Sequence, residues 1–318
     1  MNSIQRVTKI LNHQEADFVP FRMRMDKELE ATFNDMYCGG ENHAVFFDDD
    51  IIHTNLCGEF VFPGTYDGIT YDTLPMPDDA AFVLMKTEVD EIHARGKVAF
   101  NPYTPGMYET VTGISGVAEA LMDMHLDPVN LTGRIEKVGA WHLELIKKKV
   151  ATGIDILLLG DDLGTQKSLF MSLEYYRKFY KQWHVKLVRE ARRVNPDIKI
   201  AFHCCGHMMS LVPELIDVGI DILETLQPEA HNDRALLKKE YGKDLCFWGG
   251  IGMQSVFWGQ EPAYVIEKVR EALALLSEGG GYLCSPCHIA TNDIPPENIK
   301  AFYDAVSMYK DYPHPGKR

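Results

Sequence analysis

The chain of 318 residues has 46 acidic residues against 32 lysines and arginines, which gives a formal net charge of −14. With 46% hydrophobic residues, its composition is typical of a globular enzyme that can bury a sizeable core. The acidic balance disfavours nonspecific binding to nucleic acid or to an anionic membrane. Small molecules and other proteins are therefore the expected partners.

The lack of a recognisable targeting signal and the cysteine usage predict a cytoplasmic protein. Residues 1–12 form an amphipathic helix pattern without the apolar core and cleavage site of a signal peptide. No apolar run approaches about 18 residues, so no membrane span is expected. The 7 cysteines are an odd number without the dense spacing of a disulfide framework, which favours free or metal-bound thiols.

The first hundred residues are less regular than the rest of the chain. After the predicted helix, a passage towards Pro20 leads into a segment in which Arg22 and Arg24 alternate with apolar residues. If this segment is a first barrel strand, both arginines point inward; if it is an edge element, both face solvent. The acidic run 48–50 is typical of a solvated turn, but the apolar run before it suggests that at least one carboxylate lies near the core.

From Val98 onward, short strand-like runs alternate with helical patterns. This alternation predicts an α/β fold with a parallel sheet, either a closed (β/α)8 barrel or an open doubly wound sheet. No G-x-G-x-x-G fingerprint follows an early strand, so we favour a TIM barrel, a single domain over residues 1–318 with an elaborated N-terminal portion. The predicted strands are 98–100, 154–159, 198–202, 220–223, 245–248 and 281–284, and the predicted helices are 134–151, 172–194, 209–218, 234–241, 262–276 and 296–309.

The stretch after the strand at 198–202 has the chemistry of a metal site. Successive side chains of an extended segment point to opposite faces, so His203 and Cys205 share a face and offer a nitrogen and a sulfur ligand for zinc. A later pair, Cys287 and His288, follows another strand, and only one of the two can share its face with the site. The alternative is a buried histidine beside an inert cysteine.

Other polar residues fall where predicted strands end, which is where TIM barrels place catalytic groups. Asp161 and Asp162 could cap a following segment, or they could orient substrate, donate a metal ligand or move a proton. The remaining candidates at these junctions are Gln166 and Glu224 as catalytic residues and Asn101 and Gln227 as cofactor-binding residues.

Several stretches in the C-terminal two-thirds form an ordered set of motifs: Gly160-Asp-Asp-Leu-Gly-Thr-Gln166, Phe202-His-Cys-Cys-Gly206, Leu226-Gln-Pro-Glu-Ala230, Phe247-Trp-Gly-Gly-Ile251 and the run from Ser285 to Asn298. With these motifs the chain resembles the uroporphyrinogen decarboxylase superfamily. The resemblance implies a (β/α)8 barrel, and the superfamily includes zinc-dependent methyltransferases that act with corrinoid proteins.

The resemblance also bears on the zinc ligands. The methyltransferase branch carries H-x-C and a later Cys as zinc ligands, and His203 and Cys205 match the first two. Alignment of the following Pro-Pro-Glu-Asn places His288 where that branch has its Cys and the decarboxylases have a His, with Cys287 one residue earlier. The third ligand is therefore His288 or, after a local shift, Cys287.

The resemblance implies a zinc-dependent methyltransferase that moves a methyl group between a methylcobalamin-bearing corrinoid protein and a thiol or other small acceptor. One alternative is a tetrapyrrole decarboxylase, although the segment 21–25 does not match the Gly-Arg-Tyr-Leu-Pro type segment of the true decarboxylases. A second alternative is a noncatalytic barrel with structural zinc. The sequence leaves the oligomeric state open, a homodimer included.

Overall fold

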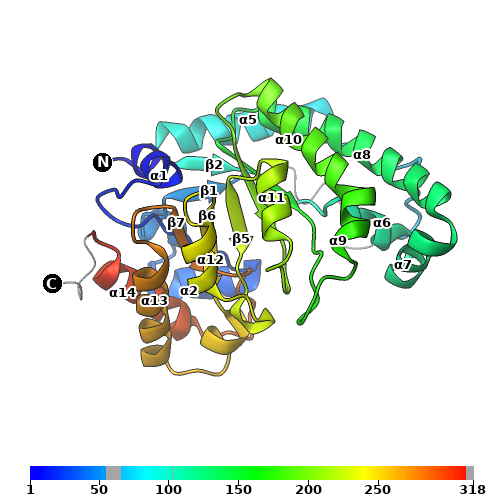
Figure 1. Ribbon diagram of the computed structural model, residues 1–318. Helices are drawn as coiled ribbons and strands as arrows, with labels where there is room; N and C mark the ends of the chain where they lie inside the picture. Colours follow the sequence, from blue (N-terminus) through cyan, green and yellow to red (C-terminus); the bar gives the residue numbers. More distant parts are fainter. Residues whose placement is uncertain (55–65, 102, 313–318) are drawn as a thin grey trace. The chain divides into compact units, whose positions relative to one another are not determined.

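The computed structural model describes residues 1–54, 66–101 and 103–312 (Figure 1). The chain divides into two compact units. Unit 1 comprises residues 1–52, 96–98 and 222–318, and unit 2 comprises residues 53–95 and 99–221. Within the described residues, none of the helices combines the length and the apolar character that a membrane crossing requires.

The strands follow one another in chain order, from β1 to β7, and the pairs β2–β3, β3–β4, β5–β6 and β6–β7 are parallel. This order, with helices between the strands, confirms the predicted α/β fold class. The strands are β1 (Ile51–His53), β2 (Val98–Phe100), β3 (Ile156–Gly160), β4 (Lys199–His203), β5 (Ile222–Thr225), β6 (Cys246–Ile251) and β7 (Tyr282–Pro286).

Unit 2 holds the helices that follow β1, β2, β3 and β4. The long helices α8 and α10 lie side by side in it (Figure 1). Its helices are α5 (Asp79–Ala94), α6 (Met107–Ser115), α7 (Val117–Leu126), α8 (Pro128–Ala151), α9 (Leu173–Tyr175), the π-helix η1 (Tyr176–Lys181), α10 (Gln182–Val194) and α11 (Val212–Val218).

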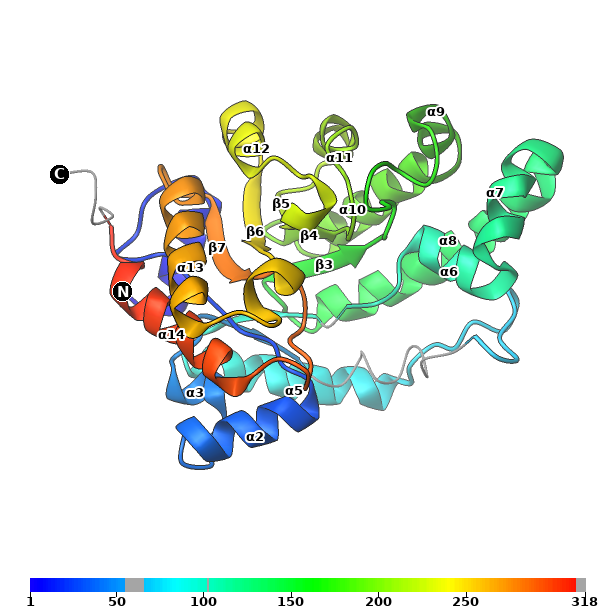
Figure 2. The same cartoon turned by 90° about the horizontal axis from the view of Figure 1, so that it is seen from below.

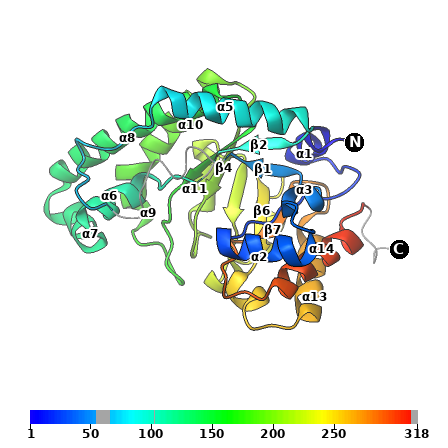
Figure 3. The same cartoon turned by 180° about the vertical axis from the view of Figure 1, so that it is seen from behind.

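Unit 1 holds the N-terminal helices and those that follow β5, β6 and β7. Helix α14 packs beside α13 (Figure 2) and also contacts α2 (Figure 3). The helices of this unit are α1 (Ser3–Leu11), α2 (Lys27–Tyr37), α3 (His43–Phe46), η2 (Pro228–Ala230), α12 (Arg234–Tyr241), the π-helix η3 (Met253–Phe257), α13 (Pro262–Leu276) and α14 (Pro296–Tyr309).

The observed boundaries of the elements agree best with the predicted ones where the sequence carries a helix start signal. Helices α12, α13 and α14 begin and end at the predicted residues. Helix α8 begins earlier than predicted, because Asp127 accepts a hydrogen bond from the amide of Asn130 and Pro128 occupies the first turn. Strands β3 to β7 extend beyond their apolar runs, so that His203 and Glu224 are strand residues.

The segment with the two arginines lies beside β7 in unit 1. Phe21 and Met25 form parallel bridges with Cys284 and Ala290, and the amide of Arg22 donates to the carbonyl of Cys284 at 3.0 Å. Arg22 is only 5% exposed. The segment therefore has the strand-like, inward-facing placement that the first-strand interpretation requires.

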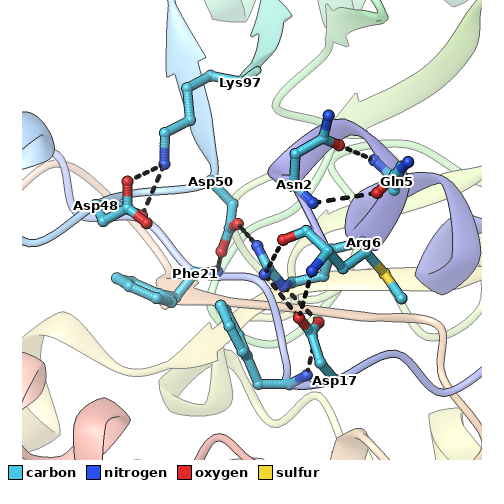
Figure 4. Close-up of polar contacts among 10 residues, drawn as sticks. Asn2, Gln5, Arg6, Asp17, Phe21, Asp48, Asp50 and Lys97 are labelled. Carbon is cyan, nitrogen blue, oxygen red and sulfur yellow. Dashed lines mark hydrogen bonds and ion pairs between the residues drawn. The ribbon is translucent and has the colours of Figure 1, made fainter. Parts of the chain in front are cut away.

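Arg6 of α1 is the centre of an ion network in unit 1 (Figure 4). Its guanidinium donates to both oxygens of Asp17 and, at 2.6 Å, to Oδ1 of Asp50. Asp50 is fully buried, and its second oxygen accepts from the amide of Phe21 at 3.2 Å. The network therefore connects the first helix to the segment before β1 and to the arginine-bearing segment.

The acidic run 48–50 is divided between surface and core. The side chain of Asp48 is 79% exposed and pairs with Lys97, whereas Asp49 is 1% exposed. Oδ2 of Asp49 accepts from the amide of Met23 at 3.0 Å and from the hydroxyl of Tyr303 at 3.4 Å, and Oδ1 has no hydrogen-bond partner among the described atoms. Burial raises the pKa of Asp49 from 3.8 to about 7.

This pKa predicts how stability depends on pH. Between the unfolded and folded pKa values the folded state holds a proton that the unfolded state releases, so Asp49 contributes stability fully at pH 4 and loses it as the pH rises through about 7. We expect Asp49→Asn to raise the free energy of unfolding at pH 8 by on the order of 3 kcal/mol and to have progressively less effect on acidification. Urea denaturation between pH 5 and pH 8 measures it. Asp48→Asn is the control. If the free energy of unfolding changed with pH equally in Asp49→Asn and in wild type, the expectation would be contradicted.

Candidate metal centre

The end of β4 brings the two predicted zinc ligands together. His203 is the last residue of β4 and stands opposite Gly160 in the pairing with β3. Its Nε2 lies 3.4 Å from the sulfur of Cys205, as expected for two residues on one face of an extended segment. His203 is 8% exposed and Cys205 is half-buried, so the pair is held by packing yet remains accessible.

Asp162 completes a group of three metal-ligating side chains. Its Oδ1 lies 3.6 Å from Nε2 of His203 and accepts a hydrogen bond from the amide of Cys205 at 2.6 Å. Each of Asp162, His203 and Cys205 offers one ligand atom, and these three atoms lie within 4.8 Å of one another. Imidazole nitrogen, thiolate sulfur and carboxylate oxygen are the protein ligands of zinc, so this donor set fits the ion and leaves a fourth position for water or substrate.

Asp161 has a different environment from its neighbour. It is fully buried, and its carboxylate accepts from the backbone amides of Tyr108 at 2.8 Å and Glu109 at 3.0 Å, which belong to the first turn of α6. Nε2 of His184 lies 3.2 Å from its Oδ2. These contacts favour the capping interpretation for Asp161, although the helix it caps precedes it in the chain.

Sequence reasoning did not single out Glu109 and Tyr103, which lie next to the triad. Oε2 of Glu109 accepts from the hydroxyl of Tyr103, from the amide of Gly106 at 3.0 Å and from the amide of Asp162 at 3.3 Å. The ring centroid of Tyr103 lies 4.6 Å from that of His203. Burial, followed by the charges of Asp161 and Asp162, raises the pKa of Glu109 to about 7. A glycine N-cap followed three residues later by glutamate is a readable capping signal, but it does not reveal the contact with Asp162.

Two glycines make room for this arrangement. A Cβ atom on Gly106 would clash with the carbonyl oxygen of Gly160 and with the carboxylate of Asp161. A Cβ atom on Gly160 would clash with the ring of Tyr103. The close approach of α6 to the end of β3 therefore depends on the absence of side chains at both positions.

Gly106→Ala is expected to destabilise the protein by about 1–3 kcal/mol, because backbone and a buried carboxylate must move to admit the methyl group. Gly133→Ala is a matched control in α8, where a Cβ meets nothing within 4 Å. It should raise stability by about 0.5–1 kcal/mol through helix propensity. Urea denaturation of both variants measures the effects, and a Gly106→Ala protein as stable as wild type would show that the close approach is not required.

The remaining candidates of unit 2 are Asn101 and Gln166. Asn101 is fully buried. Its Oδ1 accepts from the backbone amide of Leu158 at 2.6 Å and its Nδ2 donates to the carbonyl of Leu158 at 3.1 Å, as a neighbouring strand would. This geometry favours a structural role over the predicted cofactor contact. Gln166 is exposed in the loop between the bridged residues Gly164 and Leu169.

The candidates in unit 1 lie in β5 and in the loops that follow β5 and β7. Glu224 is half-buried in β5, and Gln227 follows that strand. Cys287 is 3% exposed, its amide donates to the carbonyl of Ile251 at 2.9 Å, and burial raises the pKa of its thiol well above the ordinary value. His288 is exposed. The expectation that His288 or Cys287 supplies the third ligand stays a prediction.

Comparison with known proteins identifies the family. The sequence model of the family described as uroporphyrinogen decarboxylase (URO-D) matches residues 102–309, more than half of the chain. The chain belongs to the uroporphyrinogen decarboxylase family. The match includes the triad and Glu109, and it confirms the resemblance carried by the motifs.

Curated relatives within the uroporphyrinogen decarboxylase family are distant but cover nearly the whole chain. The uroporphyrinogen decarboxylase of Tolumonas auensis is 24% identical across 94% of this chain and 87% of that protein. The uroporphyrinogen decarboxylase of Actinobacillus succinogenes is 22% identical across 96% of this chain and 90% of that protein.

Solved structures confirm the predicted TIM-barrel fold of this family member. A methyltransferase from Methanosarcina mazei superposes with a TM-score of 0.71 at 15% identity, covering 96% of this chain and 98% of that one. Xylanase 10B from Thermotoga maritima superposes with a TM-score of 0.51 at 11% identity over the same shares of the two chains. At these identities the likeness concerns the fold.

Proposed function

We propose that this protein is a zinc-dependent methyltransferase that moves a methyl group between a corrinoid carried by a partner protein and a thiol or other small acceptor. The observation that carries the proposal is the donor set at the end of β4, in which His203, Cys205 and Asp162 offer nitrogen, sulfur and oxygen within 4.8 Å. The fold likeness to a solved methyltransferase supports it.

The residues of the triad have distinct parts in this proposal. His203, Cys205 and Asp162 hold the ion, and Asp162 also fixes the chain at Cys205 by accepting its amide. A zinc ion held by these residues would lower the pKa of a coordinated thiol, so that the acceptor would react as a thiolate at neutral pH. In that reaction the thiolate sulfur would form the new bond to the methyl carbon of the corrinoid substrate. The cobalt–carbon bond would break with its electron pair remaining on cobalt, and the thiol proton would go to solvent.

A second candidate function is decarboxylation of a substrate rich in carboxylates. One support is that Arg22 and Arg24 are largely buried in unit 1. The other is that the curated relatives are named for this activity. Burial, with the nearby charge of Arg24, lowers the pKa of Arg22 to about 9, so the Arg22 guanidinium remains charged at neutral pH. Guanidinium groups bind carboxylates through paired hydrogen bonds.

The test compares the two reactions on one preparation. Purified protein loaded with zinc is mixed with methylcobalamin and a panel of thiols, and demethylation is followed by visible absorption; decarboxylation of uroporphyrinogen is followed separately. The proposal expects demethylation that His203→Ala abolishes and that His125→Ala, at an exposed histidine of α7, leaves intact. Decarboxylation that is unaffected by His203→Ala, without demethylation by any thiol, would establish the second candidate instead.

A further inference from the structure

We propose that Glu109 is a positioning residue of the metal centre, which fixes Asp162 and Tyr103 around the site where His203 and Cys205 bind the ion. The inference rests on the proposed function, because it concerns the same centre. Glu109 is not offered as a ligand: it acts through its neighbours.

Three donors from different parts of unit 2 converge on one oxygen of Glu109. Oε2 accepts from the amide of Gly106 at the start of α6, from the amide of Asp162 after β3, and from the hydroxyl of Tyr103 in the loop after β2. A carboxylate oxygen that accepts from three such donors holds their segments at fixed separations. Removing the carboxylate would leave the amide of Asp162 without this acceptor.

Glu109 is itself held in place from the opposite direction. Its own backbone amide and that of Tyr108 donate to the carboxylate of Asp161. Asp161 thus binds α6 while Glu109 of α6 binds the amide of Asp162, and the two contacts form a reciprocal bridge between the helix and the end of β3. The bridge constrains the backbone immediately before the carboxylate that we assign as a metal ligand.

Tyr103 extends this constraint to His203. The hydroxyl of Tyr103 donates to Glu109, and its ring packs against the imidazole of His203 with an interplanar angle of 55°. Gly160 opposite lacks the Cβ that would exclude the ring. The ring therefore limits the orientations open to the His203 side chain, and the Glu109 carboxylate limits the position of the ring.

Groups that orient metal ligands in this way typically contribute a factor of about 10–100 to metal affinity without touching the ion. We expect Glu109→Ala to weaken zinc binding by about 10–100-fold. Glu109→Gln retains an acceptor oxygen and should stay within about threefold of wild type. Glu136→Ala, at an exposed residue of α8, is the matched control and should bind as wild type does.

The experiment measures zinc affinity by chelator competition and records the visible spectrum of the Co²⁺-loaded protein, whose band shape reports ligand geometry. Loss of affinity with a changed spectrum in Glu109→Ala, and recovery in Glu109→Gln, would support the inference. Unchanged affinity and spectrum in Glu109→Ala, or an equal loss of zinc affinity in Glu109→Ala and Glu109→Gln, would overturn the inference. In either case, zinc binding by the wild type would leave the proposed function standing. Absence of zinc binding in wild type would overturn both.

A second pair of variants tests the contact between Tyr103 and His203 without altering α6, in case Glu109→Ala does not fold. Tyr103→Phe keeps the ring against His203, whereas Tyr103→Ala removes it. The inference expects weaker zinc binding for Tyr103→Ala than for Tyr103→Phe. Equal affinities for the two variants would show that the ring does not orient His203.

Discussion

Replacing either His203 or Cys205 by alanine is expected to weaken zinc binding by more than about 100-fold, beyond the usual effect of groups that only orient ligands. Each change removes one of the three donor atoms that lie within 4.8 Å of one another. Zinc bound through the two remaining donors loses a direct bond as well as the preorganised geometry. Chelator competition and the metal content of purified protein measure the effect.

The neighbouring cysteine supplies a control for this prediction. Cys204 is fully buried and its sulfur lies 3.4 Å from the carbonyl oxygen of Cys205. Because successive side chains of an extended segment face opposite ways, Cys204 is not expected to be a ligand. Cys204→Ala should keep the zinc affinity of wild type; the same loss as in Cys205→Ala would contradict the assignment of the two sulfurs.

The second large effect is expected at Arg6. Arg6→Met should lower the free energy of unfolding by about 3–5 kcal/mol, because removal of one partner leaves a buried charge without compensation. Burial raises the pKa of Asp50 while Arg6 opposes this shift, so the ionised carboxylate depends on the guanidinium beside it. Urea denaturation at pH 7 measures the loss.

Two further variants separate the ion pair from other effects of Arg6→Met. Adding Asp50→Asn should recover part of the lost stability, because the buried charge is then absent. Arg193→Ala, at a side chain that is 67% exposed, should change stability by no more than about 0.5 kcal/mol. Equal losses for Arg6→Met and Arg193→Ala would show that the network in Figure 4 does not stabilise the fold.

The alternation of apolar runs and helical patterns was sufficient to predict the α/β barrel, because strands buried on both faces read as continuous apolar runs. The same strand argument predicted that His203 and Cys205 share a face, and their ligand atoms lie 3.4 Å apart. Side-chain direction is regular only within the strand. Beyond it, the sequence could not tell which of Asp161 and Asp162 faces the site, since loop geometry decides.

Two other features lay beyond sequence reasoning. Asn101 follows a strand and therefore has the pattern of a site residue, but its amide replaces a strand partner by bonding the backbone of Leu158. Glu109 reads as an ordinary capping residue, and its contact with Asp162 joins segments that are 53 positions apart in the chain. Such contacts depend on how α6 approaches β3, which no local pattern encodes.

The assignment of a catalytic zinc held by Asp162, His203 and Cys205 is tested most directly by X-ray absorption at the zinc edge, with and without a thiol acceptor. The account predicts one sulfur ligand per zinc in the resting protein, from Cys205, and a second when the thiol is added. Two sulfur ligands in the resting protein would contradict this assignment and would favour the alternative in which Cys287 is a ligand. A ligand set that the thiol does not change would contradict the assignment as well.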